Sequence, residues 1–423
     1  MSRDTTVELP FGHSQLAVSV PASNLLGVFV PRETEAVTDE MSVVRGALEN
    51  PIGLPRLRNL ARPGQRVVIV TSDGTRPCPS ERLLPPVLDE LTAEGVSERD
   101  ITVVIGLGLH RPMTEDELQA VVGTEVYRRV RVVNHDAKDT IRVGVTSFGT
   151  PVEIFRPVVE ADFRVCLGNL EFHYFAGYSG GAKAILPGCA SDATVTANHA
   201  MMVRPEAKAG RLAGNPVRAD LEEGAAMVGV DFILNVVVDG KHRIVGAVAG
   251  DVTAAHRAGC DMVAQRGVVA IPALADIVLV SAGGYPKDVN LYQAQKALDN
   301  AAYAVKPGGV IILAAECGEG CGNRMFEQWM TQGDTPPQLL ERIQQRFVLG
   351  GHKAAAIALV SRKARVFLVS SSLGHIPLAG MEHHATVGTA LAAALEALGS
   401  GVQVIVLPGG GSVLPQVERE FST

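Results

Sequence analysis

The chain is poor in aromatic side chains and has no long apolar run. Its 423 residues include one Trp, six Tyr and 12 Phe, so we expect cores built mainly from Val, Ile, Leu and Ala. It contains no stretch of about 18 apolar residues, the length that a membrane-spanning helix needs. The first ten residues, MSRDTTVELP, lack the apolar core of an export signal. These absences argue against a membrane or secreted protein.

Basic clusters and paired metal-binding cysteine motifs are also missing. The formal net charge is −7 without a long basic run, which argues against nucleic acid or a membrane surface as partner. Of six cysteines only Cys317 and Cys321 are close together, and one Cys-x3-Cys pair is a weak zinc pattern. Without an export signal, we expect reduced thiols and a cytoplasmic location.

The composition is that of an α/β protein. Hydrophobic residues make up 47% and charged residues 20%, with 44 Gly and 24 Pro, as in a globular enzyme with many tight turns. A chain of this length exceeds one simple core. We predict two α/β domains with mostly parallel Rossmann-like sheets, residues 1–270 and 271–423, with additional antiparallel strands in the first. The active site is expected in the cleft between the domains.

Hydrophobic patterns predict the individual elements. Gln65–Thr71 is an unbroken apolar run rich in β-branched residues, typical of a strand buried on both faces. Thr114 and Glu117 have the spacing of a capping box, and Asp239-Gly240 predicts a two-residue hairpin turn. An antiparallel opening piece is expected from Thr5–Leu16 and Gly27–Val30. Further strands are expected at Ile101–Ile105, Val130–Val133, Ile141–Val145, Phe163–Leu167, Phe232–Val238, Ile244–Val248, Ile277–Ser281, Val310–Ala314, Val366–Val369 and Val402–Leu407. Helices are expected at Ser80–Glu94, Ser191–Met201, Asp251–Gln265, Asn290–Ala304, Asn323–Met330, Pro337–Phe347 and Val387–Leu398.

Polar residues follow three of the predicted strands directly. Asp73 and Arg76 come after the first, His110 and Arg111 after the second, and His173 after Phe163–Leu167. Ligands of open α/β sheets bind at the carboxyl ends of the strands. The repetition therefore indicates a ligand site at this edge.

Two nucleotide-binding motifs are only approximated. Gly106-x-Gly108 follows a strand, but Arg111 occupies the third position of the dinucleotide fingerprint. The segment from Gly177 to Lys183 resembles a phosphate-binding loop, yet Ala182 replaces the glycine before the lysine and Ala184 the hydroxyl residue after it. The sequence therefore disfavours both a nicotinamide site of the usual kind and a nucleoside triphosphatase.

The densest group of reactive side chains lies between residues 169 and 199. It contains His173, Lys183 and His199, with Gly180 and Gly181 just before the lysine. A glycine-rich turn allows a ligand to approach the backbone closely, and imidazole or amine groups can act as bases, metal ligands or nucleophiles. An ordinary loop between strand and helix is the alternative for any one of them.

Five segments together resemble the nickel-pincer lactate racemase family. They are DGTRP (73–77), GLGLHRPMT (106–114), EFHYFAGYSGGAKAILPG (171–188), ANH (197–199) and LYQAQK (291–296). The resemblance covers nearly the whole chain in order, and the block from 171 to 199 is its most specific part.

The resemblance implies an unusual cofactor, a nicotinate-derived mononucleotide whose two sulfur arms hold nickel. It implies that Lys183 carries this nucleotide through a thioamide, that Gly180, Gly181 and Asp73 line its site, and that His199 ligates the nickel. Imidazole is a suitable nickel ligand. Enzymes that synthesise the cofactor would then be partners during maturation.

The same resemblance implies racemisation at C2 of a 2-hydroxy acid. His110 and His173 match the acid–base pair, and a base on each side is what a racemase needs to act on both enantiomers. Arg76 would bind the substrate carboxylate. Lys296, Gln293 and Tyr292 of the second domain are the other candidates for substrate binding.

Alternatives to lactate racemisation remain open. The lactate enzymes of the family place a tryptophan near the substrate, whereas the only tryptophan here, Trp329, comes too early and a small-residue run at 353–359 falls near that position. An open wall at that position would admit a 2-hydroxy acid other than lactate, with a larger or more polar side chain, as an alternative substrate. The other two classes are an NAD-dependent 2-hydroxy-acid dehydrogenase and a non-catalytic relative that binds the cofactor.

Overall fold

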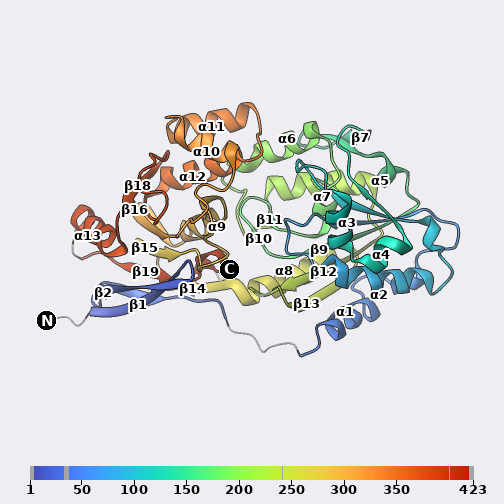
Figure 1. Cartoon of the computed structure of the whole chain (residues 1–423), viewed down its shortest axis with the longest axis horizontal. Coiled ribbons are helices and arrows are strands. Elements are labelled where there is room, and N and C mark those ends of the chain that lie inside the picture. Colours follow the sequence, from blue (N-terminus) through green and yellow to red (C-terminus); the bar gives the residue numbers. More distant parts are fainter. Residues whose placement is uncertain (1–3, 33–37, 241, 400, 419–423) are drawn as a thin grey trace. The chain divides into compact units, whose positions relative to one another are not determined.

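Parallel strands form the centre of each of two units into which the chain folds (Figure 1). The computed structural model describes residues 4–32, 38–240, 242–399 and 401–418. Unit 1 comprises Met1–Glu33 and Arg266–Thr423, and unit 2 comprises Thr34–Gln265. The sequence-based division placed residues 1–33 in the first domain, whereas in the structure they belong to the unit formed by the C-terminal part.

Unit 2 has a six-stranded sheet in the order β13-β12-β9-β4-β5-β6. All neighbours are parallel except β12 and β13, which form the predicted antiparallel pair. Residues 67–71 of the central strand are all buried, as its unbroken apolar run predicts. The strands are β4 (Val67–Ser72), β5 (Ile101–Gly106), β6 (Arg131–Asn134), β9 (Phe163–Asn169), β12 (Phe232–Val238) and β13 (Ile244–Gly250).

Helices cover both faces of this sheet (Figure 1). One face packs against α1 (Glu40–Glu49), α2 (Ser80–Thr92), α3 (Glu115–Val122) and α4 (Thr124–Arg129), whose apolar side chains share a core with the strands. The predicted capping box at Thr114 and Glu117 is present at the start of α3. The remaining elements of unit 2 are η1 (Leu57–Asn59), η2 (Glu98–Asp100), β7 (Thr140–Val145), β8 (Pro151–Phe155), α5 (Arg156–Glu160), β10 (Phe172–His173), β11 (Gly177–Tyr178), η3 (Gly181–Ala184), α6 (Asp192–Ala200), η4 (Met201–Val203), α7 (Pro216–Val228) and α8 (Ala254–Gly267).

Unit 1 has a fully parallel sheet in the order β18-β17-β16-β15-β19-β3. Its strands are β3 (Leu25–Val28), β15 (Ala275–Ser281), β16 (Val305–Ala314), β17 (Arg365–Val369), β18 (Met381–His384) and β19 (Val404–Leu407). The hairpin of β1 (Asp4–Phe11) and β2 (Ser14–Pro21) shares one core with α13 (Val387–Leu398). Other helices are α9 (Leu291–Ala301), α10 (Arg324–Thr331), α11 (Pro336–Gln345) and α12 (Gly351–Lys363), and β14 (Val268–Ile271) pairs with β20 (Leu414–Val417).

Three predicted details differ from the structure. β3 is not part of an antiparallel opening piece, because it pairs in parallel with β19 at the edge of the unit 1 sheet. The β12–β13 connection is longer than a two-residue turn, and the Asp239 N–H bonds to the carbonyl of Arg243. Helix α12 was not predicted, because residues 351–358 are all buried and show no alternation of polar and apolar faces.

A buried histidine makes the stability of unit 2 depend on pH. His135 is 3% exposed, and its Nε2 has no hydrogen-bond partner among the described residues. Burial lowers its pKa to about 4, whereas an unfolded histidine titrates near 6.5. The folded state therefore binds fewer protons, and stability is lost as the pH falls from about 6.5 towards 4.

Replacing His135 by Leu is expected to make this loss smaller. Between pH 7 and pH 5 the free energy of unfolding should fall by about 2 kcal/mol less than in the wild type, as measured by urea denaturation. The exposed His13, changed to Gln, is the control. An identical pH dependence in wild type and His135→Leu would show that this ring does not titrate on unfolding.

Candidate active site

The loop that carries Lys183 begins where β9 ends. The short antiparallel pair β10–β11 places His173 opposite Gly177, and the chain then enters η3 with Lys183 on its third residue. The Nζ of Lys183 lies 3.5 Å from Nε2 of His173 and 6.0 Å from the ring centre of Phe175. The structure thus brings together the lysine and one of the two predicted acid–base histidines.

The two glycines before Lys183 are required by packing. Gly180 and Gly181 have φ values of 73° and 58°, which non-glycine residues rarely adopt. A Cβ at Gly180 would lie 2.7 Å from Oδ1 of Asn235, and one at Gly181 would lie 2.7 Å from Cδ2 of His256. The turn packs directly against these side chains, so cofactor binding by the two glycines stays a prediction.

Burial and positive charge favour the neutral forms of Lys183 and His173. Burial lowers the pKa of Lys183 well below its ordinary value, and the charges of Arg218 and Arg76 add to this effect. Burial also lowers the pKa of His173, followed by the charges of Lys183 and Arg76. A neutral amine is nucleophilic and a neutral imidazole accepts a proton, so the lowered pKa values favour the reactive form of both groups.

Arg218 is a residue of this site that the sequence did not reveal. It lies on α7, is 1% exposed, and donates from Nε to the carbonyl of Ala176 at 3.1 Å and from its terminal nitrogen to the carbonyl of Tyr178. These bonds hold the loop before Lys183, and the charge contributes to the lowered pKa of the lysine. The pair Asn215-Pro216 marks the start of this helix with an N-cap and a proline at the first position.

His110 and Asp73 meet at the carboxyl ends of β5 and β4. The Nδ1–H of His110 donates to Oδ2 of Asp73 at 2.6 Å, and the other carboxyl oxygen accepts bonds from the N–H and hydroxyl of Thr75. Burial raises the pKa of Asp73, but the hydrogen bonds from His110 and Thr75 lower it by more, and the net pKa lies below its ordinary value. This bond leaves the lone pair of His110 on Nε2.

Asp73→Asn is expected to lower kcat by on the order of 10²-fold with little change in KM. The N–H of Thr75 can only donate, so the amide oxygen of the variant stays beside it and the NH2 group faces His110. His110 Nδ1 must then accept, which moves its proton to Nε2 and removes the base. The rate of the predicted reaction, measured from each enantiomer, reports the effect, with the exposed Asp116→Asn as control; a kcat equal to wild type would refute the orienting role.

Arg76 lies in the loop after β4, close enough for its charge to act on its neighbours. Its side chain is exposed, its N–H bonds to the carbonyl of Asp73, and its charge contributes to the lowered pKa values of His173 and Lys183. An exposed guanidinium beside the two reactive groups is suited to binding a carboxylate. That role stays a prediction.

His199 lies in the last turn of α6 and is 8% exposed. Its ring packs edge-on against Phe175 with centres 4.9 Å apart, and Phe175 also contacts His173 edge-on at 4.5 Å. The Nδ1 of His199 lies 2.9 Å from Oδ1 of Asn198. The predicted nickel ligand is therefore in the same part of unit 2 as Lys183 and His173.

The three substrate-binding candidates on α9 belong to unit 1. Gln293 and Lys296 are exposed and Tyr292 is half-buried. Lys287, which the sequence did not single out, is close to Lys296: burial and the charge of Lys296 lower its pKa, and its Nζ donates to Ser412 at 2.7 Å. Unit 1 thus presents two neighbouring cations rather than the one predicted.

A polar cluster lies beside Tyr292 in the interior of unit 1. Lys353 is 5% exposed, donates to Oε1 of Gln295 at 2.7 Å, and has its Nζ 5.2 Å from the ring centre of Tyr292. Burial raises the pKa of the nearby Asp299 to about 7 despite the charge of Lys353. His352 faces Tyr292 edge-on at 6.3 Å. Residues 353–358 of the small-residue run are therefore buried, and the run begins with the cationic Lys353.

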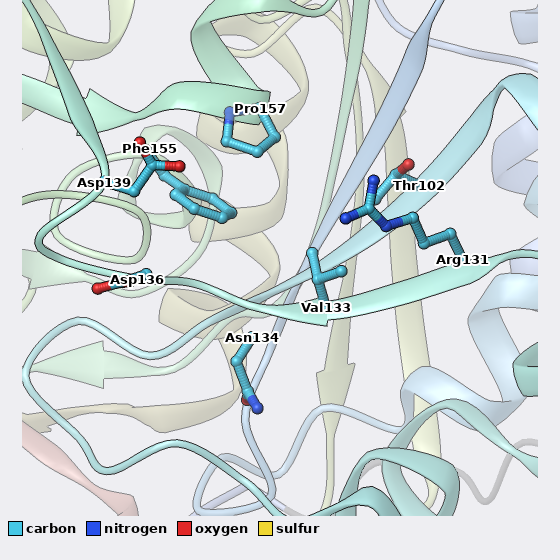
Figure 2. A pocket seen from close by; sticks show the side chains of 8 residues that line it. All are labelled: Thr102, Arg131, Val133, Asn134, Asp136, Asp139, Phe155 and Pro157. Atoms are coloured by element: carbon cyan, nitrogen blue, oxygen red, sulfur yellow. The ribbon is translucent and has the colours of Figure 1, made fainter.

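The described residues contain a cavity apart from the predicted site residues but no cluster of metal-binding side chains. A cavity of about 320 Å³ lies beside β6 (Figure 2), and none of the predicted site residues lines it; its lining is Thr102, Arg131, Val133, Asn134, Asp136, Asp139, Phe155 and Pro157. Within the described ranges, no group of three or more His, Cys, Asp or Glu side chains is arranged to hold a metal, and no helix is long and apolar enough to cross a membrane. All six cysteines are free thiols.

The sequence is similar to known lactate racemases over most of its length. The family model of the lactate racemase N-terminal domain matches residues 11–210, and that of the lactate racemase C-terminal domain matches residues 270–415. The lactate racemase of Thermoanaerobacterium thermosaccharolyticum is 36% identical over 422 residues, covering 96% of this chain and 98% of the relative. That of Lactiplantibacillus plantarum is 35% identical over 347 residues, covering 79% and 80%.

Solved structures show the same relationship. The lactate racemase apoprotein from T. thermosaccharolyticum superposes with a TM-score of 0.87 at 34% identity, covering 97% of this chain and all of that one. A Thermotoga maritima protein shares the fold, with a TM-score of 0.62 at 18% identity over 90% and 98% of the two chains. These matches define an isomerase of the racemase class. The chain belongs to the lactate racemase family.

Proposed function

We propose that this enzyme inverts C2 of a lactate-like 2-hydroxy acid by proton-coupled hydride transfer. The observation that carries the proposal is the position of Lys183, whose pKa is lowered by burial, beside His173 in the same unit as the His110–Asp73 pair. The relatives named lactate racemases support the reaction class. The six free thiols suit a reducing compartment, and we place the enzyme in the cytoplasm.

The side chains fit a nickel-pincer nucleotide attached through Lys183. Acylation needs an unprotonated amine, and Lys183 has a strongly lowered pKa. One imidazole suffices where the nucleotide brings its own sulfur and carbon ligands, and His199 is that imidazole. When bound, the group supplies the acceptor for the C2 hydride and its return. Enzymes that synthesise it would be partners during maturation.

His110 and His173 move the hydroxyl proton. One neutral imidazole takes this proton as the C–O bond becomes C=O and the C2 hydrogen leaves with its electron pair. The other histidine must carry a proton at this stage, and it returns that proton to the carbonyl oxygen when the hydride is added to the opposite face. It ends neutral while the first histidine ends protonated, and proton exchange with solvent restores the starting state. Asp73 holds His110 with its lone pair on Nε2, and burial together with the charges of Lys183 and Arg76 lowers the pKa of His173.

Positive groups bind the substrate carboxylate. Arg76 of unit 2 offers a bidentate guanidinium, and Lys296 of unit 1 offers a second charge next to Lys287. Tyr292 and Gln293 are proposed to contact the substrate from the same helix. Because a buried Lys353 adjoins Tyr292, we include 2-hydroxy acids with polar side chains among the candidate substrates.

Protein produced together with the cofactor-synthesis enzymes tests the proposal. Intact mass and metal analysis should show a covalent adduct with nickel, and either enantiomer of the substrate should be converted to the racemate without added NAD. Lactate and a panel of longer and more polar 2-hydroxy acids identify the substrate. Net oxidation that requires NAD would favour a dehydrogenase, and a fully loaded but inactive protein would favour a non-catalytic relative.

A further inference from the structure

A buried hydrogen-bond chain connects α7 to the ring of His199. Asp220 and Asn198 are 0% exposed and His199 is 8% exposed. The Nδ2 of Asn198 donates to Oδ2 of Asp220 at 2.7 Å and to the carbonyl of Val217 at 3.1 Å. The Oδ1 of Asn198 lies 2.9 Å from Nδ1 of His199. The three side chains form one continuous chain.

The direction of every bond in this chain is fixed by its far end. Asp220 accepts from the hydroxyl of Thr146 on Oδ1 and from Thr150 on Oδ2, the latter at 2.9 Å. Because both oxygens of Asp220 accept, and the carbonyl of Val217 can only accept, the group of Asn198 that faces them must be the NH2 donor. The amide oxygen of Asn198 therefore faces His199. An amide oxygen can only accept. The Nδ1 of His199 therefore carries the proton, and its lone pair is on Nε2.

We propose that Asp220 and Asn198 are positioning residues that set the tautomer of His199 and hold Nε2 ready to ligate nickel. The inference rests on the proposed function, in which His199 is the nickel ligand. Histidines that ligate metals usually donate their other N–H to an oxygen acceptor, which fixes the ring and raises its basicity. Here the acceptor is the Asn198 amide, and its orientation is set one step further away by Asp220.

The surroundings limit the ring in a second way. Phe175 packs edge-on against His199 at 4.9 Å, so rotation of the ring would break both this contact and the bond to Asn198. Thr146 and Thr150 belong to the β7–β8 connection, where the N–H of Thr150 also bonds to the Thr146 hydroxyl at 3.1 Å. The position of Asp220 is thus fixed by residues of the β7–β8 connection, which do not belong to the helix that carries Asn198 and His199. A carboxyl and an amide buried in this way are costly unless fully bonded.

The tautomer is measurable in the protein without cofactor. Nitrogen-15 NMR of histidine-labelled protein distinguishes a protonated from an unprotonated ring nitrogen, and the signals missing from His199→Gln assign the residue. We expect the wild type to carry the proton on Nδ1, and Asn198→Ala to show a mixture of tautomers. A proton on Nε2 in the wild type, or an unchanged tautomer in Asn198→Ala, overturns the inference. The wild-type measurement stands even if the variant does not fold.

Nickel retention in the loaded protein is the second measurement. Asn198→Ala should keep the adduct on Lys183 by intact mass but release nickel to a chelator on the order of 10- to 100-fold faster. Val195→Ala removes buried apolar atoms from the same helix but no hydrogen bond of the chain, and it should release nickel at the wild-type rate. Equal loss in both variants would mean that loosening of α6, not the tautomer, is responsible. Wild-type protein without adduct or nickel would refute the proposed function. The NMR measurement would still test the positioning role, because it is made on protein without cofactor.

Discussion

Lys183→Arg is expected to abolish both the covalent adduct and the racemase activity, with turnover falling by on the order of 10³-fold or more. Arginine keeps a long cationic side chain, but its guanidinium is always protonated and cannot be acylated. Lys183 has the opposite property, because burial and the charges of Arg218 and Arg76 lower its pKa well below the ordinary value. The intact mass of the protein produced with the cofactor-synthesis enzymes reports the adduct directly.

The matched control for this experiment is Lys208→Arg, which changes an exposed lysine of the same unit. It should retain the adduct and full activity. An adduct of unchanged mass on Lys183→Arg would place the attachment elsewhere in the chain. Loss of activity with a retained adduct in the control would point to general damage from the substitution.

The strands were predictable because their side chains carry the signal themselves. The central strand β4 is buried over all of residues 67–71, and such strands appear in the sequence as unbroken apolar runs. Helix α12 gave no comparable signal, since it buries most of its surface and lacks the alternation expected of a surface helix. Helix α7 gave none because it buries the polar Arg218 and Asp220 and exposes the apolar Met227. The partner of β3 is β19, far away in the sequence, and no local pattern specifies such a pairing.

The candidate site likewise contains residues that the sequence marked and residues that it did not. His110, His173 and Lys183 stand in recognisable segments, and the structure shows that His173 and Lys183 adjoin each other and that Asp73 bonds to His110. Arg218, whose charge contributes to the lowered pKa of Lys183, and Asp220, which bonds to Asn198 beside His199, lie on a helix without a motif. Their roles come from tertiary contacts with carbonyls and side chains about 20 to 70 positions away, which a single sequence does not display.

Replacing either acid–base histidine by Ala should lower racemisation by on the order of 10²- to 10⁴-fold in both directions. Full inversion uses one histidine to take the hydroxyl proton and the other to return it, so neither variant can complete the cycle. Chiral analysis of product from each enantiomer measures the loss. The exposed His13→Gln should behave as wild type.

A single-turnover experiment separates the two histidines. In His110→Ala, only the enantiomer whose hydroxyl faces His173 should still be oxidised, and it should stop as the 2-keto acid, which a carbonyl reagent traps. In His173→Ala the opposite enantiomer should give keto acid. His110 has its own carboxylate partner, Asp73, whereas the ring of His173 accepts from the N–H of Ala176 and lies beside Lys183. Asp73→Asn should therefore reproduce the enantiomer preference of His110→Ala and not that of His173→Ala. Keto acid formed from both enantiomers in either variant would contradict the assignment of one base to each face.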